Sequence, residues 1–142
     1  MTADVFIDST ILVYAHDADA GEKHQKAQAL IRPFWNQRAQ PFLSVQVFQE
    51  VHVNLVRLGV PVAQSVTTVS NYFAWRVIES TRQLLKKGFE NQQRWQLSFW
   101  DSLIVAAAQQ AGVNTLWSED LNEGQCYEAV QVVNPLMSRV VG

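Results

Sequence analysis

The predicted fold rests on the stretch Phe99-Trp-Asp-Ser-Leu-Ile-Val-Ala-Ala-Ala-Gln-Gln-Ala-Gly112, which runs directly into Val113-Asn-Thr-Leu-Trp-Ser-Glu-Asp120. Residues 99–108 are apolar apart from Asp101 and Ser102, which is typical of a helix buried over most of its circumference. Gly112 suits the position just after a helix end, and the short apolar run 113–117 predicts a buried strand. A buried helix, a stop, a strand and an acidic loop therefore follow one another without a break.

Asp101 is the exception in this stretch, because a carboxylate in so apolar a helix needs a partner. One explanation is a capping box, in which Ser98 caps the helix and Asp101 is favoured by the helix dipole. The other explanation is that further carboxylates converge on Asp101 and share a cation with it. The sequence around Asp101 alone leaves both explanations open.

Composition limits the class of protein. The chain has 142 residues, of which 48% are hydrophobic and 17% charged, so we expect one folded domain over residues 1–142. The net charge of −2 does not favour a nucleic-acid binder. Cys126 is the only cysteine, which excludes an intrachain disulfide and predicts a reducing, cytoplasmic location. We expect no membrane span, because no apolar run is long enough, and no signal peptide.

Along the chain, apolar runs and turn-formers predict strands that alternate with helices. Strands are expected at residues 4–8, 41–45, 76–79, 113–117 and 129–133. Helices are expected at 11–15, capped by Ser9 and Thr10, then at 22–37 with a kink at Pro33, 46–58, 62–75, 80–94 and 99–111. This alternation predicts an α/β fold with a central, mainly parallel sheet.

Two acids fall at the ends of predicted strands. Asp8 follows the strand that ends at Ile7, and Asp120 follows the strand that ends at Trp117. Because ligands of parallel sheets bind beyond the carboxyl ends of the strands, both acids are candidates for one site. Glu50 is a third candidate, since it lies at the edge of the apolar stripe of helix 46–58. The alternative for Glu50 is an ordinary surface glutamate.

A convergence of these acids predicts a particular chemistry. Like charges brought within a few ångströms raise one another's pKa unless a cation lies between them. Ligand sets made only of oxygen favour hard divalent ions such as Mg²⁺ or Mn²⁺. The reaction expected at such a site is metal-assisted attack of water on a phosphodiester bond. The acids proposed for it are Asp8, Glu50, Asp101 and Asp120.

These motifs, taken in order, resemble the PIN-domain ribonucleases, and in particular the VapC-type toxins of bacterial toxin–antitoxin pairs. The matching features are D-S-T near the start, Glu on the third helix, W-D-S-L-I-V-A-A-A at a helix start and S-E-D-L-N after a strand. The resemblance implies one PIN-like domain over residues 1–142, with a three-layer α/β/α fold. It also implies an endoribonuclease that uses Mg²⁺ or Mn²⁺ to hydrolyse RNA, with a homodimer and an antitoxin as partners. The family's metal-binding acids fall on Asp8, Glu50, Asp101 and Asp120.

Supporting polar positions match the family less closely. Ser118 stands two residues before the last Asp, where the family often has Thr. Thr10 stands where the family often has Asn, and Asn122, followed by Glu123, stands where a further acid is common. The differences at Thr10 and Asn122 weaken the expectation of a second bound metal ion more than the expectation of a first.

RNA contacts are expected on helix 80–94. Arg82, Lys86 and Lys87 can follow an RNA backbone, or they can form an ordinary solvated helix face. Three tryptophans could also contact RNA, because aromatic rings stack on bases. Aromatic rings more often pack in a core or a dimer interface. We expect packing for all of them, namely Trp75, Trp95 and Trp100.

Two other functions compete with the ribonuclease. A Mg²⁺-dependent phosphoryl-transfer domain also places Asp at strand ends, but Asp8-Ser-Thr10 lacks the second Asp of a D-x-D-x-T motif. A receiver-type domain needs a late Lys, and none follows Asp120. The remaining alternative is a non-catalytic α/β interaction module whose acids only cap helices, and such a module would show no metal-dependent thermal shift.

Overall fold

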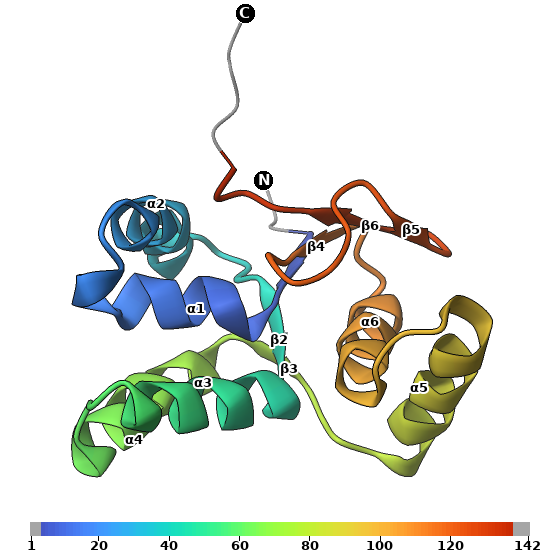
Figure 1. Ribbon diagram of the computed structural model, residues 1–142, viewed down its shortest axis with the longest axis horizontal. Helices are drawn as coiled ribbons and strands as arrows, with labels where there is room; N and C mark the ends of the chain where they lie inside the picture. The colour runs from blue at the N-terminus through green and yellow to red at the C-terminus, as the bar shows by residue number, and fades with distance from the viewer. Residues whose placement is uncertain (1–3, 138–142) are drawn as a thin grey trace, which may run out of the picture.

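The computed structural model describes residues 4–137, which are built around one six-stranded sheet (Figure 1). Its strands, in the order in which they lie side by side, are β3 (Arg76–Ile78), β2 (Phe42–Ser44), β1 (Val5–Ile7), β4 (Thr115–Trp117), β6 (Val130–Val133) and β5 (Cys126–Tyr127). Only the β5–β6 pairing within these residues is antiparallel. The predicted mainly parallel sheet is confirmed.

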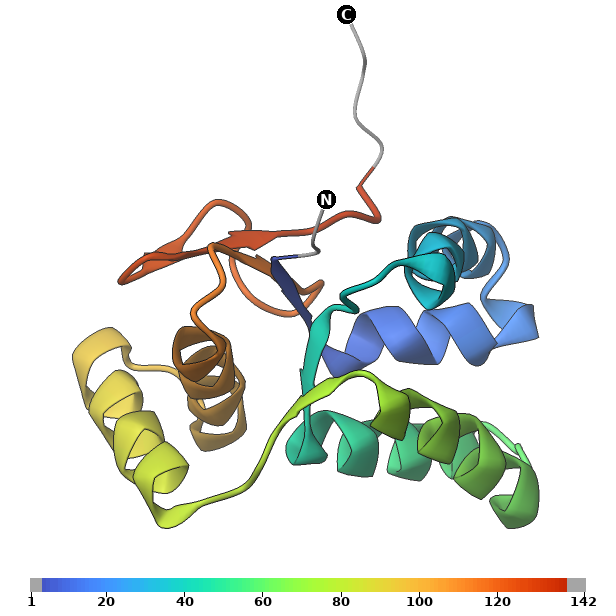
Figure 2. The ribbon, with the colours of Figure 1, turned by 180° about the vertical axis from the view of Figure 1, so that it is seen from behind.

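Helices lie on both sides of this sheet. They are α1 (Ser9–His16), α2 (Glu22–Ile31), α3 (Val45–Arg57), α4 (Val62–Asn71), α5 (Arg82–Trp95) and α6 (Phe99–Ala111), with short 3₁₀ turns η1 (Ala18–Ala20), η2 (Arg32–Asn36) and η3 (Tyr72–Ala74). Figures 1 and 2 show α5 and α6 on one side and α1 to α4 on the other. This is the predicted α/β/α arrangement. Within residues 4–137, no helix is both long and apolar enough to cross a membrane.

The organising helix is α6, which contacts β1, β2, β3, β4 and β6. Residues 104–108 of α6 are buried, and Ala106, Ala107 and Ala108 are small enough to let the helix lie close to the sheet. Helix α5 packs on the outside of α6, where Gly88 faces Leu103. A Cβ at Gly88 would lie 2.5 Å from Leu103 Cδ2, so the glycine permits this close approach.

Strand order sets the position of a crevice. From β1 the chain moves to β2 and β3 on one side, and then crosses to β4 and β6 on the other. The carboxyl ends of β1 and β4 therefore flank the switch point at which ligands bind in parallel sheets. Ile7 pairs with Trp117, and the Asp8 amide donates to the Trp117 carbonyl at 2.9 Å. Asp8 and Ser118 consequently emerge side by side at this edge.

Several predicted boundaries were wrong. The helix expected over 22–37 ends at Ile31, because Pro33 lacks the amide hydrogen that an α-helix needs, and η2 follows. Helix 62–75 likewise ends at Asn71 and continues as η3. Strand β5 was not predicted, because two residues give no alternation to read. The first helix begins at Ser9 and is capped by Asp8, and not by Ser9 or Thr10.

Candidate active site

A cavity of about 290 Å³ opens at the switch point, between the amino-terminal ends of α1 and α6, helix α3 and the loop after β4. We call it the acidic pocket, and define it by its lining residues: Asp8, Ser9, Thr10, Val13, Tyr14, Glu50, Asn54, Asp101, Ile104 and Asp120. All four acids predicted from the sequence are among them. Elements distant in the sequence therefore bring these carboxylates to one place.

Asp8 lies at the bottom of the acidic pocket and is only 3% exposed. Its Oδ1 accepts from the Ser9 amide at 2.7 Å, and its Oδ2 accepts from Ser118 Oγ at 2.8 Å. Burial raises the pKa of Asp8 to about 7, against the opposing effect of the Ser118 and Ser9 hydrogen bonds and with smaller contributions from Glu50 and Asp120. A cation bound beside this buried carboxyl would favour its charged form.

Glu50 is drawn into the site by polar neighbours. Ser9 Oγ donates to Glu50 Oε1 at 2.8 Å, and Gln46 Nε2 donates to Glu50 Oε2 at 3.0 Å. Asn54 Nδ2 donates to the Glu50 carbonyl at 2.8 Å. Gln46 Nε2 also lies 3.0 Å from the Trp100 carbonyl, so one amide ties α3 to α6. These contacts fix the Glu50 carboxylate against α1, in contrast to a mobile surface glutamate.

Asp101 and Asp120 line the rest of the acidic pocket. The Asp101 amide donates to Ser98 Oγ at 3.1 Å, so Ser98 is the cap of α6 as the capping-box explanation requires. Burial, followed by the charges of Asp101, Glu119 and Glu50, raises the pKa of Asp120. Asp101 is thus close enough to raise the pKa of Asp120. Asp101 therefore lies both in the capped first turn of α6 and in the lining of the acidic pocket.

Asp101→Asn separates the metal-binding role of Asp101 from its helix-start role. If Asp101 belongs to a cluster of repelling carboxylates, the variant should melt no lower than wild type in EDTA and should lose most of the stabilisation by Mn²⁺. Ser98→Ala is the matched control, because losing the cap should cost about 1 kcal/mol and leave the Mn²⁺ response intact. A less stable Asp101→Asn with an unchanged Mn²⁺ shift, measured by thermal melting, would leave Asp101 only a helix-start role.

The supporting polar residues fall in different places. Ser118 is fully buried and donates to Asp8, while the amides of Asp120 and Leu121 donate to its hydroxyl. Thr10 lines the acidic pocket, and its Oγ1 is buried without a hydrogen-bond partner among the residues that the structure describes. A buried hydroxyl without a partner is rare in folded proteins and marks this wall of the acidic pocket as unusual.

Asn122 lies apart from this arrangement. It is exposed and is not among the residues that line the acidic pocket, and its carbonyl accepts from the Gln125 amide at 3.1 Å. The neighbouring Glu123 accepts from the Asn134 amide. The acidic pocket is therefore built without either residue.

A polar network beside Asp120 could not be predicted from the sequence. Tyr14 Oη donates to Glu119 Oε1 at 2.6 Å, and Lys23 Nζ lies 2.7 Å from Glu119 Oε2. Burial of Glu119 opposes these contacts, but the hydrogen bonds from Lys23 and Tyr14 lower the pKa of its carboxyl overall. Helices α1 and α2 thereby hold the loop that carries Asp120.

Tyr14→Phe should destabilise the protein by roughly 1–2 kcal/mol, because a hydrogen bond to a charged group is lost at a partly exposed position. Urea unfolding measures this difference. The matched control is the same substitution in a Glu119→Gln background, where the difference should shrink because the charged acceptor has gone. Equal losses in both backgrounds would mean that Tyr14 acts through packing and not through Glu119.

The donor atoms of the acidic pocket suit a hard cation. As the side chains stand in residues 4–137, no three Asp, Glu, His or Cys side chains form a ready-made metal cluster. Mg²⁺, however, commonly takes one or two carboxylates and keeps several waters. The charged groups that line the acidic pocket are all carboxylates, and the buried Asp8 is one of them. These residues fit a divalent cation.

The cations predicted to contact RNA differ in their surroundings. Arg82 and Lys86 are exposed on α5. Lys87 Nζ lies 2.8 Å from Glu128 Oε2 and 4.0 Å from Glu90 Oε2, and Arg94 also pairs with Glu128. The positive charge of Lys87 is therefore partly neutralised, which leaves Arg82 and Lys86 as the stronger candidates.

Solved bacterial proteins share this fold, although the sequence matches no family model and no curated protein. The toxin VapC20 of Mycobacterium tuberculosis, described as cleaving the sarcin–ricin loop, is 20% identical, with a TM-score of 0.66 over 82% of this chain and 91% of that one. A toxin–antitoxin complex from Klebsiella pneumoniae is 18% identical, with a TM-score of 0.68 over 92% and 97%. FitAcB from Neisseria gonorrhoeae is 13% identical, with a TM-score of 0.60 over 92% and 97%.

These similarities extend over most of each chain and confirm the fold predicted from the motifs. The described residues have the PIN-like α/β/α fold of VapC-type toxins. At such low identity the match concerns the fold, and the chemistry must be argued from the acidic pocket itself.

Proposed function

We propose that this chain, which has the fold of the VapC-type toxins, is a metal-dependent endoribonuclease and the toxin of a toxin–antitoxin pair. The observation that carries the proposal is the meeting of four carboxylates from separate elements in one pocket, at the switch point of a parallel sheet. Helix caps alone do not explain this arrangement, because Glu50 lies inside α3 and is held by Ser9 and Gln46.

Asp8, Glu50, Asp101 and Asp120 would hold Mg²⁺ or Mn²⁺. A cation bound there supplies Lewis-acid stabilisation of the negative charge that develops on the phosphate. Ser118 and Ser9 orient the Asp8 and Glu50 carboxylates through the hydrogen bonds described above. The Thr10 hydroxyl, which has no partner among residues 4–137, would donate to a phosphate oxygen of the bound strand.

RNA is the proposed substrate, and two features support an anionic ligand despite the acidic pocket. The amino-terminal ends of α1 and α6 point their dipoles at the acidic pocket and favour negative charge there. Arg82 and Lys86 provide positive charge on the neighbouring helix α5. Acids concentrated at a metal site and cations beside it are compatible with RNA binding by a protein of net charge −2.

RNA cleavage should require a divalent cation. Purified protein should cut single-stranded RNA in Mg²⁺ or Mn²⁺ and lose this activity in EDTA, because stabilisation worth several kcal/mol is removed. Gel analysis of end-labelled RNA measures the rate, and restoring the cation after EDTA should restore activity. Full activity in EDTA would contradict the proposed function.

A second copy and an antitoxin are the proposed protein partners, in a cytoplasmic setting. Large apolar side chains are exposed on α3, the following turn, α4 and η3, and an apolar surface of this kind favours protein contacts. They are Val53, Leu58, Val62, Val66 and Phe73. A small gene for a DNA-binding protein beside the gene for this chain would support the antitoxin.

A further inference from the structure

A groove of about 340 Å³ lies next to the acidic pocket, between the start of α3, the start of α5 and the start of α6. We call it the aromatic groove, and the residues used below are Gln46, Gln49, Arg82, Leu85, Trp100 and Leu103. Trp100 is 61% exposed, which is unusual for so large an apolar side chain. Trp100 is therefore not packed in the core of the described residues, and packing in a dimer interface stays a prediction.

Trp100 is supported by other aromatic rings and does not stand alone. Its ring centre lies 4.9 Å from that of Phe99 in an edge-to-face arrangement, and the Phe99 ring lies 6.0 Å from that of Phe89 on α5. These contacts limit the motion of an indole whose surface remains open to solvent. A rigid, exposed aromatic face is suited to stacking against a flat ligand.

The aromatic groove adjoins the acidic pocket. Trp100 directly precedes Asp101, and Gln46 Nε2 binds both the Trp100 carbonyl and Glu50 Oε2 at 3.0 Å. One glutamine thus forms part of the wall between the two spaces. The two spaces are therefore neighbours on the same side of α3 and α6, on either side of this side chain.

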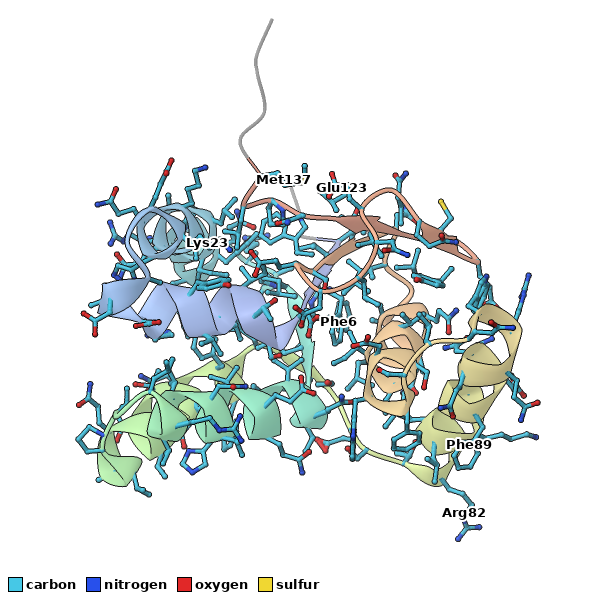
Figure 3. The ribbon with its side chains drawn as sticks, in the orientation of Figure 1. Phe6, Lys23, Arg82, Phe89, Glu123 and Met137 are labelled. Carbon is cyan, nitrogen blue, oxygen red and sulfur yellow. The ribbon has the colours of Figure 1, made fainter. Side chains whose placement is uncertain are left out.

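The charge and polarity of the aromatic groove narrow the class of ligand. Figure 3 shows Arg82 extending from the start of α5 and Phe89 further along the same helix. Arg82 brings a cation to a lining of apolar and uncharged polar side chains, and Gln49 adds an exposed side-chain amide. An aromatic face, an arginine and an amide together match a nucleotide, whose base stacks and whose phosphate pairs with a guanidinium.

We propose that the aromatic groove binds one unpaired base of the RNA strand whose phosphodiester lies in the acidic pocket. The base stacks on the Trp100 indole, and Arg82 contacts a neighbouring phosphate. This proposal rests on the proposed function and adds to it a preference for single-stranded RNA at the position beside the cut, because a base paired in a duplex cannot enter the groove.

The test compares two strands of equal length and charge: oligoadenylate, and an abasic sugar–phosphate strand. Fluorescence anisotropy in EDTA measures binding while a metal-dependent enzyme leaves the strands intact. Wild type should bind oligoadenylate roughly 5- to 150-fold more tightly than the abasic strand, since stacking on one aromatic residue contributes that much. Trp100→Ala should lose this preference, and Trp100→Phe should keep much of it.

Phe73→Ala is the matched control, because Phe73 is 60% exposed but lies on η3 against Phe48, in a different cavity. It should keep the wild-type preference for oligoadenylate. Arg82→Ala provides a measurement independent of the indole. It should weaken binding of both strands alike and flatten the salt dependence, because a phosphate contact is lost from each.

Two outcomes would overturn the proposal: a Trp100→Ala variant that still prefers oligoadenylate as wild type does, or an Arg82→Ala variant with unchanged affinity and salt slope. Either result would assign the aromatic groove to another ligand, such as a protein. A separate cleavage assay in Mn²⁺ distinguishes this failure from failure of the ribonuclease. Wild type that shows the Trp100-dependent preference but cuts no RNA would overturn the proposed function alone.

Discussion

Asp8→Asn should lower the rate of metal-dependent RNA cleavage by about a thousandfold or more, and Glu50→Gln should have an effect of similar size. Both substitutions remove a negative charge from the acidic pocket and keep nearly the same shape. Metal-supplied stabilisation is worth several kcal/mol, and each 1.36 kcal/mol corresponds to a tenfold change in rate, which gives about this loss. Single-turnover cleavage of end-labelled RNA in saturating Mn²⁺ measures it.

Glu79→Gln is the matched control for this prediction. Glu79 directly follows β3, so it is also an acid at a strand end, but it lines a separate apolar cavity with Phe48 and Phe73. Its replacement should leave the cleavage rate within a few-fold of wild type. If Asp8→Asn and Glu79→Gln retained equal activity, the acidic pocket would not be the site of cleavage.

Some of this site could be predicted because it depends on strand ends. A short apolar strand followed by Asp fixes the edge of the sheet at which that Asp appears, and parallel strands share this edge. Asp8 and Asp120 were placed correctly by this rule, as their common pocket shows. Glu50 and Asp101 could be placed only on helix faces, and the family resemblance selected them from among other acids.

Contacts that cross between elements could not be predicted from the sequence. Gln46 binds both Glu50 and the Trp100 carbonyl, and this depends on how α3 and α6 pack against each other. The Tyr14–Glu119 hydrogen bond joins residues that are 105 positions apart. Neither contact leaves a local pattern of polarity or spacing. Sequence reasoning therefore recovered the four acids and Ser118, and missed the roles of Gln46 and Tyr14.

The tryptophans show the same limit. Trp75 is 4% exposed and Trp95 packs against Tyr127, as expected for rings that serve packing. Trp100 lies at the start of an apolar helix, where burial would be expected, yet it is 61% exposed. Trp100 lies in the first turn of α6, ahead of the buried residues 104–108. Only the packed structure identifies which ring is available to a ligand.

The non-catalytic alternative must account for Glu50 and for the raised pKa of Asp8. Asp8 does cap α1, so part of that alternative is correct. An ordinary cap, however, is exposed to water, whereas Asp8 is 3% exposed and its second oxygen is held by Ser118. A buried carboxyl with a raised pKa makes the folded state less stable at neutral pH. Ionisable groups whose pKa is shifted in this way are commonly found at functional sites.

The stability of the metal-free protein should fall as the pH rises from about 4 to about 7. Burial raises the pKa of Asp8 from 3.8 to about 7, so in this window the folded chain keeps a proton that the unfolded chain has lost. Because the folded state binds more protons there, the free energy of unfolding decreases with pH. The full difference above pH 7 is on the order of 4 kcal/mol.

Asp8→Asn should remove most of this pH dependence and make the metal-free protein more stable than wild type at about pH 8. Urea unfolding in EDTA at several pH values measures both effects. In Mn²⁺ at the same pH, wild type should become more stable than Asp8→Asn. The reason is that Mn²⁺ binds the folded wild type and competes with the proton on Asp8. Equal pH profiles for wild type and Asp8→Asn in EDTA would show that the buried carboxylate is neutralised by another group. A Mn²⁺ response retained in full by Asp8→Asn would remove Asp8 from the proposed ligands.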